Sequence, residues 1–390
     1  MSIMHNTKNK KILIVGLFPP PYSSGERVIT QYVNDLLEPI YDVTAINMSI
    51  GILAPPSFKL SSISYYLKTL INFILVFKKV YFLTRSNQFS LCYLTPSSSS
   101  LGHIRDTIIV KLLNNNIKSL VINIQNGNYD IVFKRGWHSQ LTKAYASRIT
   151  TAIFTSEILK KRCIDNLGED KCAIIRNSVD DKVTCTHEEV TTAMSIKNKS
   201  DSFIICYISN MSPTKGYMDL FEALKSMDAK ERHSITVHFV GEWLSNEQLI
   251  DFKNLLSQND LEKHVVIHGK INDRVLLKKF YLQSHVFILP TYFPQEAQPV
   301  SIIEALNAGV PVISTKHASI PDLIKEGNNG ILVDIKSPTQ IKKAILKLKS
   351  DKLYWNKLSL NARRFFLENF TSEKIRKSLL DLFNKELNRN

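Results

Sequence analysis

The sequence has 390 residues, more than a single hydrophobic core usually serves, so two domains are expected. Hydrophobic residues make up 44% and charged residues 22%, which is typical of a globular protein and excludes a largely disordered chain. The formal net charge is +15, and residues 1–149 alone hold 16 Lys and Arg against 6 Asp and Glu. This surplus predicts an anionic partner for the first part of the chain: nucleic acid, a membrane surface or a diphosphate-bearing lipid.

The five cysteines form no C-x-x-C pair; they are Cys92, Cys163, Cys172, Cys185 and Cys206. Their odd number and spacing argue against both a disulfide framework and a zinc knuckle, and they fit a reducing compartment. The first residues hold a short apolar stretch with no small-residue cleavage site behind it, so no signal peptide is expected.

Short β-branched runs alternate with longer helical patterns, which is typical of an α/β fold. The first set predicts strands at residues 11–18, 41–48, 89–96, 119–125, 151–156 and 171–177. A polar stretch at 184–202 has little pattern and is interpreted as a linker. The second set predicts strands at 202–209, 235–241, 265–269, 285–291, 311–315 and 330–334. Two doubly wound sheets in tandem are predicted, with ligands at the carboxyl ends of strands and in the cleft between domains.

The first predicted strand leads through a proline-rich turn to Ser23, Ser24 and Gly25, which precede an amphipathic helix. A loop of small residues at a helix start offers N–H groups and positive dipole to an anion, although any strand-to-helix turn can use Ser and Gly. The loop has neither the G-x-G-x-x-G nor the P-loop spacing, so no dinucleotide or ATP fingerprint is present.

The most hydrophobic segment runs from Tyr65 to Leu83 and is interrupted by Lys68, Asn72, Lys78 and Lys79. Its uncharged runs fall short of the roughly 18 to 20 residues that a membrane span needs. The segment is either a core helix with basic residues on its wet side or an aromatic, lysine-rich helix lying on a membrane surface.

Two further polar positions allow a functional and a structural interpretation. Arg105, in "GHIRD", follows a serine-rich loop and suits either an acceptor phosphate or a salt bridge with Asp106. His264 and His268 are four apart on a predicted strand, a spacing of about 13 Å, so structural histidines are favoured over a shared metal.

The second half repeats the strand–loop–helix pattern in "CYISNMSPTKGYMDLFEAL", with Lys215 and Gly216 at the helix entrance. A lysine beside a helix N-terminus opposes the helix dipole, and an anionic ligand would remove that conflict. The alternative is an exposed surface lysine.

The stretch "FPQEAQPVSIIEALNAGVPVIST" (293–315) carries two glutamates eight positions apart. Pro299 suits the first helical turn and Gly309 the position after the last, so a helix is predicted over 299–308 with Glu296 in the loop before it. Glu304 lies on the helix among small residues, where a carboxylate can accept hydrogen bonds from two vicinal hydroxyls. A dipole-stabilising glutamate and a solvated helix glutamate are the structural alternative.

This stretch resembles the E-x7-E region of retaining family-4 (group 1) glycosyltransferases, which have the GT-B fold of two Rossmann-like domains facing across a cleft. "NMSPTKG" resembles the phosphate-binding loop of that family, "IIRNSVD" (174–180) its "I-P-N-G-V-D" segment, and "VVIHGKI" the turn beside the base. The resemblance covers nearly the whole chain and is strongest over 203–335. It implies an acceptor domain at 1–190, a nucleotide-sugar domain at 200–368 and a final helix, 369–390, that returns to the first domain.

Roles follow from the resemblance by position. It implies that Glu296 faces the transferred sugar, that Lys215 contacts the diphosphate as the second catalytic residue, and that Glu304 binds the ribose hydroxyls. The other implied donor contacts are Gly25, Asn210, Gln298, Pro299, Val300, Ser301, Lys270 and Ile271.

Three positions depart from the family pattern. Asn210 stands where an arginine usually accompanies the lysine, and "EAQP" replaces "E-G-F-G". Where many members have a first-domain histidine, Gln125 or Asn126 is the nearest equivalent, and with Arg105 they complete the candidate acceptor contacts. Neither amide can act as a general base at neutral pH.

The resemblance implies a retaining enzyme that needs no metal and no cofactor. The departing phosphate takes the acceptor's proton, and no D-x-D triplet suggests metal-bridged diphosphate binding. The expected donor is a UDP- or GDP-sugar. The expected acceptor is a lipid-diphosphate glycan or a cell-surface polysaccharide precursor of O-antigen, capsule or exopolysaccharide type, reached from the cytoplasmic face of the membrane.

Rival functions remain open. A sugar-nucleotide epimerase or a glycan phosphorylase can share the fold, although the cofactor-lysine context of a phosphorylase is not found. A nucleic-acid-binding protein would explain the charge, but no helix-turn-helix, zinc or RNP-like pattern accompanies it.

Overall fold

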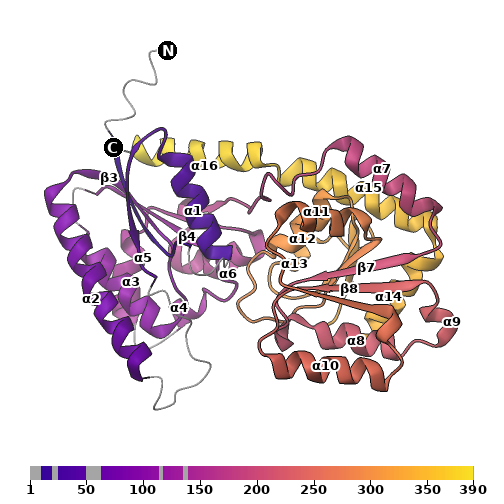
Figure 1. Ribbon diagram of the computed structural model, residues 1–390. Coiled ribbons are helices and arrows are strands. Elements are labelled where there is room, and N and C mark those ends of the chain that lie inside the picture. The colour runs from indigo at the N-terminus through magenta and orange to yellow at the C-terminus, as the bar shows by residue number, and fades with distance from the viewer. Residues whose placement is uncertain (1–9, 20–24, 50–62, 114–116, 135–138, 390) are drawn as a thin grey trace. The chain divides into compact units, whose positions relative to one another are not determined.

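The computed structural model (Figure 1) describes residues 10–19, 25–49, 63–113, 117–134 and 139–389. Ser23 and Ser24 of the predicted small-residue loop lie outside these residues. The chain divides into two compact units: unit 1 holds residues 1–175 and 376–390, and unit 2 holds residues 176–375. Each unit contains one six-stranded parallel sheet.

Unit 1 is built on a sheet with strand order β2-β1-β3-β4-β5-β6. The strands are β1 (Lys11–Gly16), β2 (Asp42–Asn47), β3 (Phe89–Leu94), β4 (Ser119–Ile124), β5 (Thr151–Phe154) and β6 (Cys172–Ile174). The helices are α1 (Gly25–Leu37), α2 (Ile63–Ser86), α3 (Ser100–Leu112), α4 (Ile131–Lys134), α5 (Ser139–Arg148), α6 (Glu157–Leu167) and α16 (Ser372–Leu387). Strand β4 is buried along its whole length, as expected for a parallel sheet that is covered on both faces.

Unit 2 has the strand order β12-β11-β10-β7-β8-β9. The strands are β7 (Phe203–Ile208), β8 (Ile235–Val240), β9 (Val265–Gly269), β10 (Val286–Leu289), β11 (Val312–Thr315) and β12 (Gly330–Val333). The helices are α7 (His187–Lys199), α8 (Tyr217–Lys225), α9 (Ala229–Arg232), α10 (Asn246–Gln258), α11 (Arg274–Gln283), α12 (Val300–Asn307), α13 (Ile320–Leu323), α14 (Pro338–Ser350) and α15 (Lys352–Asn369). The prediction of two doubly wound parallel sheets is confirmed.

Sheet topology determines where each unit is expected to bind a ligand. The strand order reverses between β7 and β10 in unit 2 and between β1 and β3 in unit 1, although all strands are parallel. Loops that leave neighbouring strands in opposite directions at such a switch point open a crevice at the carboxyl ends of the strands. Most predicted site residues of unit 2 follow β7 and β10, whereas Lys270 and Ile271 follow β9.

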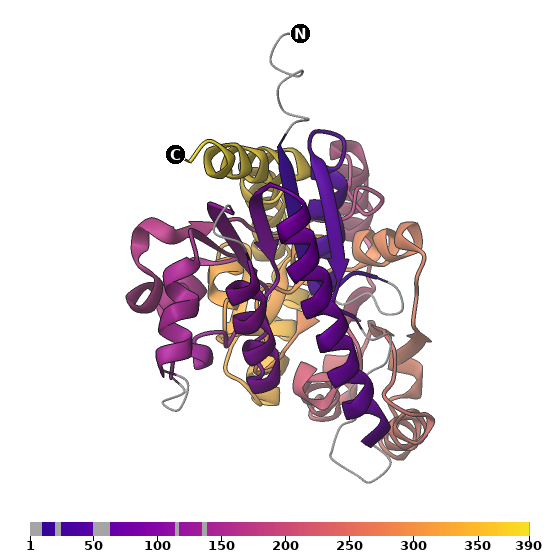
Figure 2. The ribbon, with the colours of Figure 1, turned by 90° about the vertical axis from the view of Figure 1, so that its left-hand side faces the viewer.

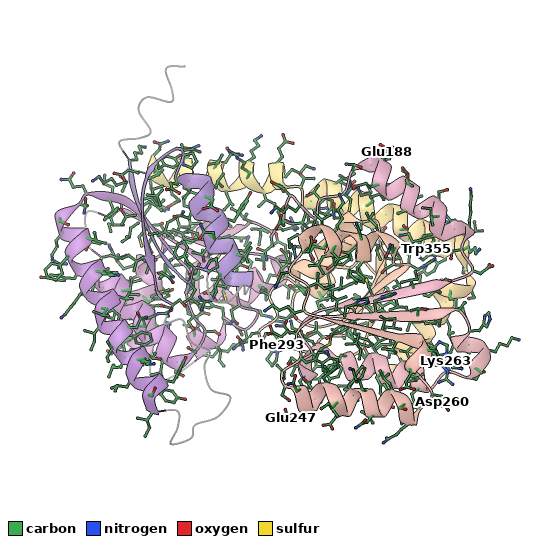
Figure 3. The ribbon with its side chains drawn as sticks, viewed as in Figure 1. Glu188, Glu247, Asp260, Lys263, Phe293 and Trp355 are labelled. Carbon is green, nitrogen blue, oxygen red and sulfur yellow. The ribbon has the colours of Figure 1, made fainter. Side chains whose placement is uncertain are left out.

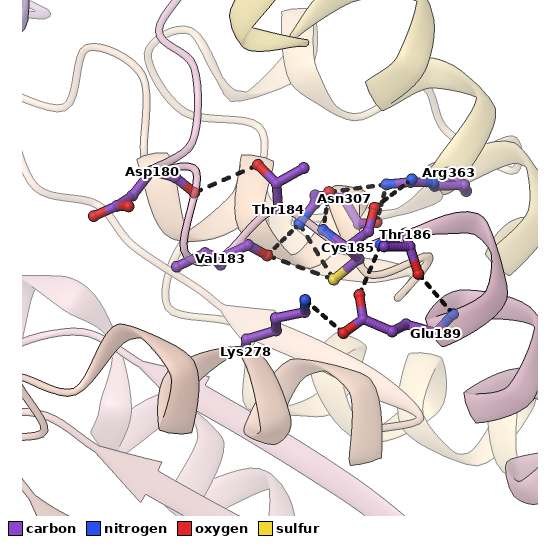
Figure 4. Close-up of polar contacts among 9 residues, drawn as sticks. All are labelled: Asp180, Val183, Thr184, Cys185, Thr186, Glu189, Lys278, Asn307 and Arg363. Carbon is purple, nitrogen blue, oxygen red and sulfur yellow. Dashed lines mark hydrogen bonds and ion pairs between the residues drawn. The ribbon is translucent and has the colours of Figure 1, made fainter.

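The predicted linker at 184–202 is wrong, because this stretch forms α7 and packs into unit 2. Thr186 and Glu189 form a capping box at the start of α7, and Glu189 also pairs with Lys278 at 2.6 Å (Figure 4). The segment before α7 is held by Asn307, whose side chain donates to the Val183 carbonyl (2.9 Å) and accepts from the Cys185 N–H (3.2 Å).

The predicted domain limits of 190, 200 and 368 differ from those of the compact units. Unit 1 leaves its sheet after β6 at residue 175, and the following segment already belongs to unit 2. Arg363 of α15 helps to fix that segment, since it donates to the Cys185 carbonyl at 2.7 Å (Figure 4). At the other end, the chain joins unit 1 again from Arg376, within α16.

Candidate active site

Two loops meet at the switch point of the unit 2 sheet. One runs from β7 to α8 through Lys215, and the other runs from β10 towards Glu296. The Tyr292 N–H donates to the Thr214 carbonyl at 2.8 Å and ties the loops together. Gly216 makes the approach possible, because its φ is +79° and a Cβ there would lie 2.2 Å from the Pro290 carbonyl oxygen. The sequence thus folds the predicted cation and the predicted carboxylate into one place.

Lys215 and Glu296 form a largely buried ion pair. The Lys215 Nζ lies 2.6 Å from Glu296 Oε2, with side-chain exposures of 20% and 8%. Thr291 Oγ1 donates to the same carboxylate oxygen at 3.1 Å. The ammonium also lies 4.7 Å from the centre of the Phe293 ring, labelled in Figure 3. Each partner of the pair thus has a further contact: Thr291 for Glu296 and Phe293 for Lys215. A buried ion pair needs such additional interactions to offset the cost of its desolvation.

Glu304 lies on α12, and the limits of this helix are close to the predicted ones. Gly309 lies just beyond the end of the helix and has a φ of +65°. Its side chain is 5% exposed and pairs with Arg274 of α11. Tyr281, also on α11, donates its hydroxyl to the second carboxylate oxygen at 2.7 Å. Both sequence-predicted glutamates are thus fixed by partners within unit 2.

Arg274 links Glu304 to a second carboxylate. Its Nε lies 3.5 Å from Asp180 Oδ2. Burial would by itself lower the pKa of Arg274, but the charge and hydrogen bond of Glu304, together with Tyr281 and Asp180, outweigh this effect and the pKa is raised. Burial, followed by the Glu304 carboxylate, raises the pKa of the Tyr281 hydroxyl well above its usual value. Arg274 therefore stays charged and Tyr281 stays a hydrogen-bond donor across the physiological pH range.

The arrangement leaves acceptor capacity on both glutamates. A carboxylate offers about four lone-pair sites, and the Glu304 side chain uses one on each oxygen for Arg274 and Tyr281. The remaining sites suit two neighbouring hydroxyl donors. Lys215, on the loop from β7 to α8, reaches Glu296 in the loop before α12, and its ammonium has further N–H groups for an anion.

The remaining predicted donor contacts in unit 2 lie around these two pairs. Asn210 is exposed in the loop after β7, and Pro299 occupies the N-cap of α12. Val300 and Ser301 form the first turn of α12 and are partly buried. The first N–H groups of a helix have no partner within the helix, so this turn is a position for an anionic group.

Three predicted donor contacts lie in other surroundings. The side chain of Gln298 accepts a hydrogen bond from the Asn177 N–H at 2.7 Å, so its amide oxygen is used within unit 2. Lys270 is exposed and pairs with Glu242 at 2.9 Å, beside the partly buried Ile271. Gly25 is in unit 1, at the start of α1, and among the described residues no atom beyond its chain neighbours and its own helix lies within 4 Å of where a Cβ would stand.

The predicted acceptor residues all lie in unit 1. Arg105 is buried and pairs with Asp106 at 2.7 Å, so the salt bridge that the sequence left open is formed. Gln125 donates to Asn123 Oδ1 at 2.9 Å, and the Asn126 side chain accepts from the Asn128 N–H at 3.1 Å. Gln125 and Asn126 follow the carboxyl end of β4 and are partly buried.

A titratable group beside this cluster was missed from the sequence. Glu26 lies in the first turn of α1, and burial raises its pKa from 4.5 to about 7, with the Arg105 guanidinium opposing the shift. A glutamate in the first helical turn is a common dipole-stabilising residue, so nothing in the sequence marks Glu26 as a group with a raised pKa. The raised pKa of Glu26 arises from its burial in the folded unit, which the local sequence does not display.

The histidines of β8 and β9 pair with each other. The rings of His238 and His268 stack with centres 5.1 Å apart, and His238 Nδ1 lies 2.8 Å from His268 Nε2. His264 instead contacts the Ile235 carbonyl at 3.0 Å. Among the residues that the structure describes, no group of three or more His, Cys, Asp or Glu side chains could hold a metal ion.

Comparison with known proteins identifies a family match and the fold. Residues 191–365 match the family of glycosyl transferases group 1. The chain superposes on Anabaena Alr3699/HepE, solved in complex with UDP, with a TM-score of 0.68 at 15% identity, covering 96% of this chain and 100% of that one. The match to the group 1 glycosyl transferases thus covers residues 191–365, and the chain as a whole has the GT-B fold.

Curated relatives match over shorter stretches. Spore coat protein SA of Bacillus subtilis is 25% identical over 201 residues, which is 51% of this chain and 52% of that protein. The capsular polysaccharide biosynthesis glycosyltransferase CapM of Staphylococcus aureus is 27% identical over 187 residues, 47% of each chain. The chain thus spans about half the length of these relatives. Within the described residues, no helix is both long and apolar enough to cross a membrane.

Proposed function

We propose that the protein transfers a sugar from a nucleotide-sugar donor to the precursor of a cell-surface polysaccharide, with retention of anomeric configuration and without a metal. The observation that carries the proposal is the ion pair between Lys215 and Glu296, formed by the loops after β7 and β10, with Glu304 on the helix that follows the second loop. The family match of residues 191–365 supports the reaction class. The UDP complex of HepE and the capsule function in the name of CapM support the donor and the acceptor classes.

In the proposed donor complex, unit 2 holds the nucleotide sugar. Glu304 accepts hydrogen bonds from the two ribose hydroxyls through the lone pairs that Arg274 and Tyr281 leave free. Lys215 donates hydrogen bonds to the diphosphate through the N–H groups that Glu296 does not use. The diphosphate also contacts the N–H groups of the first turn of α12. Glu296 then faces the sugar hydroxyls. The two-hydroxyl grip of Glu304 favours a UDP- or GDP-sugar over a deoxyribose donor.

The proposed chemistry places the bond changes on one face of the sugar. The bond between the anomeric carbon and the diphosphate oxygen breaks, and the acceptor oxygen bonds to that carbon from the same side. The acceptor proton passes to the departing phosphate oxygen. The protein contributes alignment of the substrates and stabilisation of the charge that develops on the diphosphate, and Lys215 supplies the stabilising cation.

Unit 1 is the proposed acceptor side. Its basic charge suits an acceptor with a diphosphate, and Arg105, Gln125 and Asn126 are the proposed contacts. A lipid-linked glycan at the cytoplasmic face of the membrane has this chemistry. The protein would then act as a peripheral membrane enzyme.

Charge-neutral variants test the donor site. We expect Lys215→Ala and Glu304→Gln each to lower kcat/KM by about 10²- to 10³-fold with a UDP-sugar and a lipid-linked acceptor, because each removes a charged contact to the donor. Glu304→Gln should also weaken stabilisation of the folded protein by UDP in a thermal melt. Lys225→Ala is the matched control, since Lys225 is an exposed lysine that pairs with Glu222 on the surface of α8. Transfer rates equal to wild type in the Lys215 and Glu304 variants would refute the donor site.

A further inference from the structure

Helix α2 of unit 1 exposes an unusual number of large apolar side chains. Only Val76, Val80 and Thr84 of its 24 residues are buried. The exposed ones, with exposures of 36 to 65%, are Ile63, Tyr66, Leu67, Leu70, Ile71, Ile74, Leu75, Tyr81 and Phe82. No other helix within the described residues exposes more than three large hydrophobic side chains. In Figure 2, where the side of unit 1 that carries α2 faces the viewer, α2 is the long purple helix in the foreground.

These side chains form a continuous face. Val76, Val80 and Thr84 are four apart and make one buried stripe towards the rest of unit 1. Asn72 fixes the helix on that side by donating to the Met48 carbonyl at 3.0 Å. Ile63, Leu67, Leu70, Ile71 and Ile74 recur at helical spacing on the opposite side. We call the nine exposed apolar side chains the α2 face.

The charge along α2 is entirely positive. The helix carries Lys68, Lys78, Lys79 and Arg85 and no acidic residue. Lys78, Lys79 and Arg85 all lie near its C-terminal end, close in sequence to Tyr81 and Phe82, and the Arg85 guanidinium lies 3.7 Å from the centre of the Tyr81 ring. Apolar residues next to aromatic rings and basic side chains are the chemistry of a helix that lies in a membrane–water interface.

Two other occupants fit the α2 face less well. A transmembrane arrangement is not available, since the helix is not apolar enough to span. A two-fold contact with a second copy would bring two helices with four positive charges each against one another. An anionic lipid surface satisfies both the apolar side chains and the cations.

We propose that the α2 face is the membrane-docking surface of this protein, with its apolar side chains inserted at the headgroup–acyl boundary of an anionic bilayer and its basic residues over the lipid phosphates. This inference assigns a surface to the membrane contact of the proposed function. Only the biological purpose of the contact rests on that function. The interaction itself needs neither donor nor acceptor.

Vesicle binding by the full-length chain tests the inference. We expect co-sedimentation with vesicles of phosphatidylcholine and phosphatidylglycerol in equal parts, weakened as NaCl rises from about 0.1 to 0.5 M. Leu70→Asp/Ile74→Asp should weaken binding by at least about tenfold, because it puts charge into the interface. Lys78→Gln/Lys79→Gln should weaken binding to these vesicles by about 10- to 30-fold and leave the weak binding to pure phosphatidylcholine unchanged.

The control variant replaces two exposed apolar residues on another surface by aspartate. Ile250→Asp/Leu353→Asp changes two residues of unit 2 that are 56% and 84% exposed, and it should bind vesicles as the wild type does. Phe82→Trp gives a readout that does not depend on weakened binding: its emission should shift to the blue on binding and be quenched by brominated lipid. Thermal melts of every variant confirm that the chain is folded.

Three outcomes would overturn the inference. The wild type could fail to bind the mixed vesicles, or the Leu70/Ile74 variant could bind them as tightly as the wild type. In the third outcome, the wild type forms dimers without lipid and does not bind vesicles, and the Leu70/Ile74 variant is monomeric. That result would identify a second copy of the chain as the partner of the α2 face. The vesicle assay contains no sugar substrate. If the proposed transferase function is wrong, vesicle binding is still expected, and if vesicle binding is absent, the proposed donor site is not affected.

Discussion

Glu304 is oriented by two side chains from a single helix, Arg274 and Tyr281 of α11. If Glu304 grips the ribose, its carboxylate must keep one orientation when the donor leaves. We therefore expect Arg274→Ala to raise the KM for the donor by about tenfold and to change kcat little, since one charge-assisted contact to a buried carboxylate is lost. Initial rates over a range of donor concentrations measure the two parameters separately.

The conservative variant separates positioning from charge alone. Arg274→Lys keeps the cation but cannot reach Asp180 and Glu304 together with one planar fork, so an intermediate KM is expected. A loss of kcat in Arg274→Ala without a change in KM would contradict the positioning role. It would place Arg274 in contact with the transition state.

Glu26 makes the stability of unit 1 depend on pH. Its pKa is about 7 in the folded chain against an ordinary value of 4.5, so folding takes up a proton between these pH values and stability falls as pH rises through them. Glu26→Gln should remove this dependence and raise the free energy of unfolding above pH 7 by on the order of 2 kcal/mol, less than the full shift implies because the side chain is only partly buried. Urea unfolding at pH 5 and pH 8 measures the difference.

The control is Glu38→Gln, an exposed glutamate just after α1. Its stability should follow the wild type at both pH values. An equal gain from Glu26→Gln at pH 5 and pH 8 would show that packing, and not titration, is responsible.

At the site, the sequence indicated the two glutamates and the lysine but not the residues that hold them. Glu296 and Glu304 stand out because their spacing and surroundings resemble a family motif. Arg274 and Tyr281 carry no such signal, because they reach Glu304 from 30 and 23 positions away only when α11 packs against α12. Contacts between elements depend on tertiary packing that one sequence does not display.

At the scale of elements, strong local signals gave accurate limits. Helix α12 was predicted over 299–308 and spans Val300–Asn307, because Pro299 and Gly309 mark its ends. Helix α7 was missed, since its apolar residues do not repeat clearly. The capping box of Thr186 and Glu189 was nevertheless visible as T-x-x-E, and it outweighs a weak apolar pattern as a sign of a helix start.

Helix α2 shows the limit of apolar content as a guide to burial. Its sequence was compatible with a core helix or with a surface helix, because apolar residues occur all around it. Only its packing, with buried residues confined to the stripe of Val76, Val80 and Thr84, shows which side chains are left exposed.

For the whole molecule, the number and type of sheets followed from the alternation of strand and helix patterns, but the course of the chain between units did not. The segment after β6 passes into unit 2 at residue 176, and the chain joins unit 1 again only at residue 376. The hydrogen bonds that decide these limits join residues far apart in sequence. An example is the bond from Asn307 to Val183, 124 positions away.

The return of the chain makes unit 1 depend on its last residues. Leu379 and Phe383 of α16 are buried, and Glu386 is a buried carboxylate that accepts from Thr151 Oγ1 at 3.0 Å. The Phe383 ring lies 5.9 Å from that of Tyr93 on β3. Burying such an apolar side chain contributes about 1.5–3 kcal/mol, and removing Glu386 leaves its partners without a hydrogen bond.

We therefore expect a chain that ends at residue 375 to retain the fold of unit 2 and to lose that of unit 1. Hydrogen exchange should show fast exchange in β1 and β3–β5 and unchanged protection in β7, β8 and β10. The point variants Phe383→Ala and Glu386→Gln should weaken unit 1 in the same pattern, by about 3–5 kcal/mol for the phenylalanine. Lys377→Ala, an exposed change on the same helix, should do neither. If the shortened chain keeps protected strands in both units, the hydrogen bonds and packing of α16 do not hold unit 1 together.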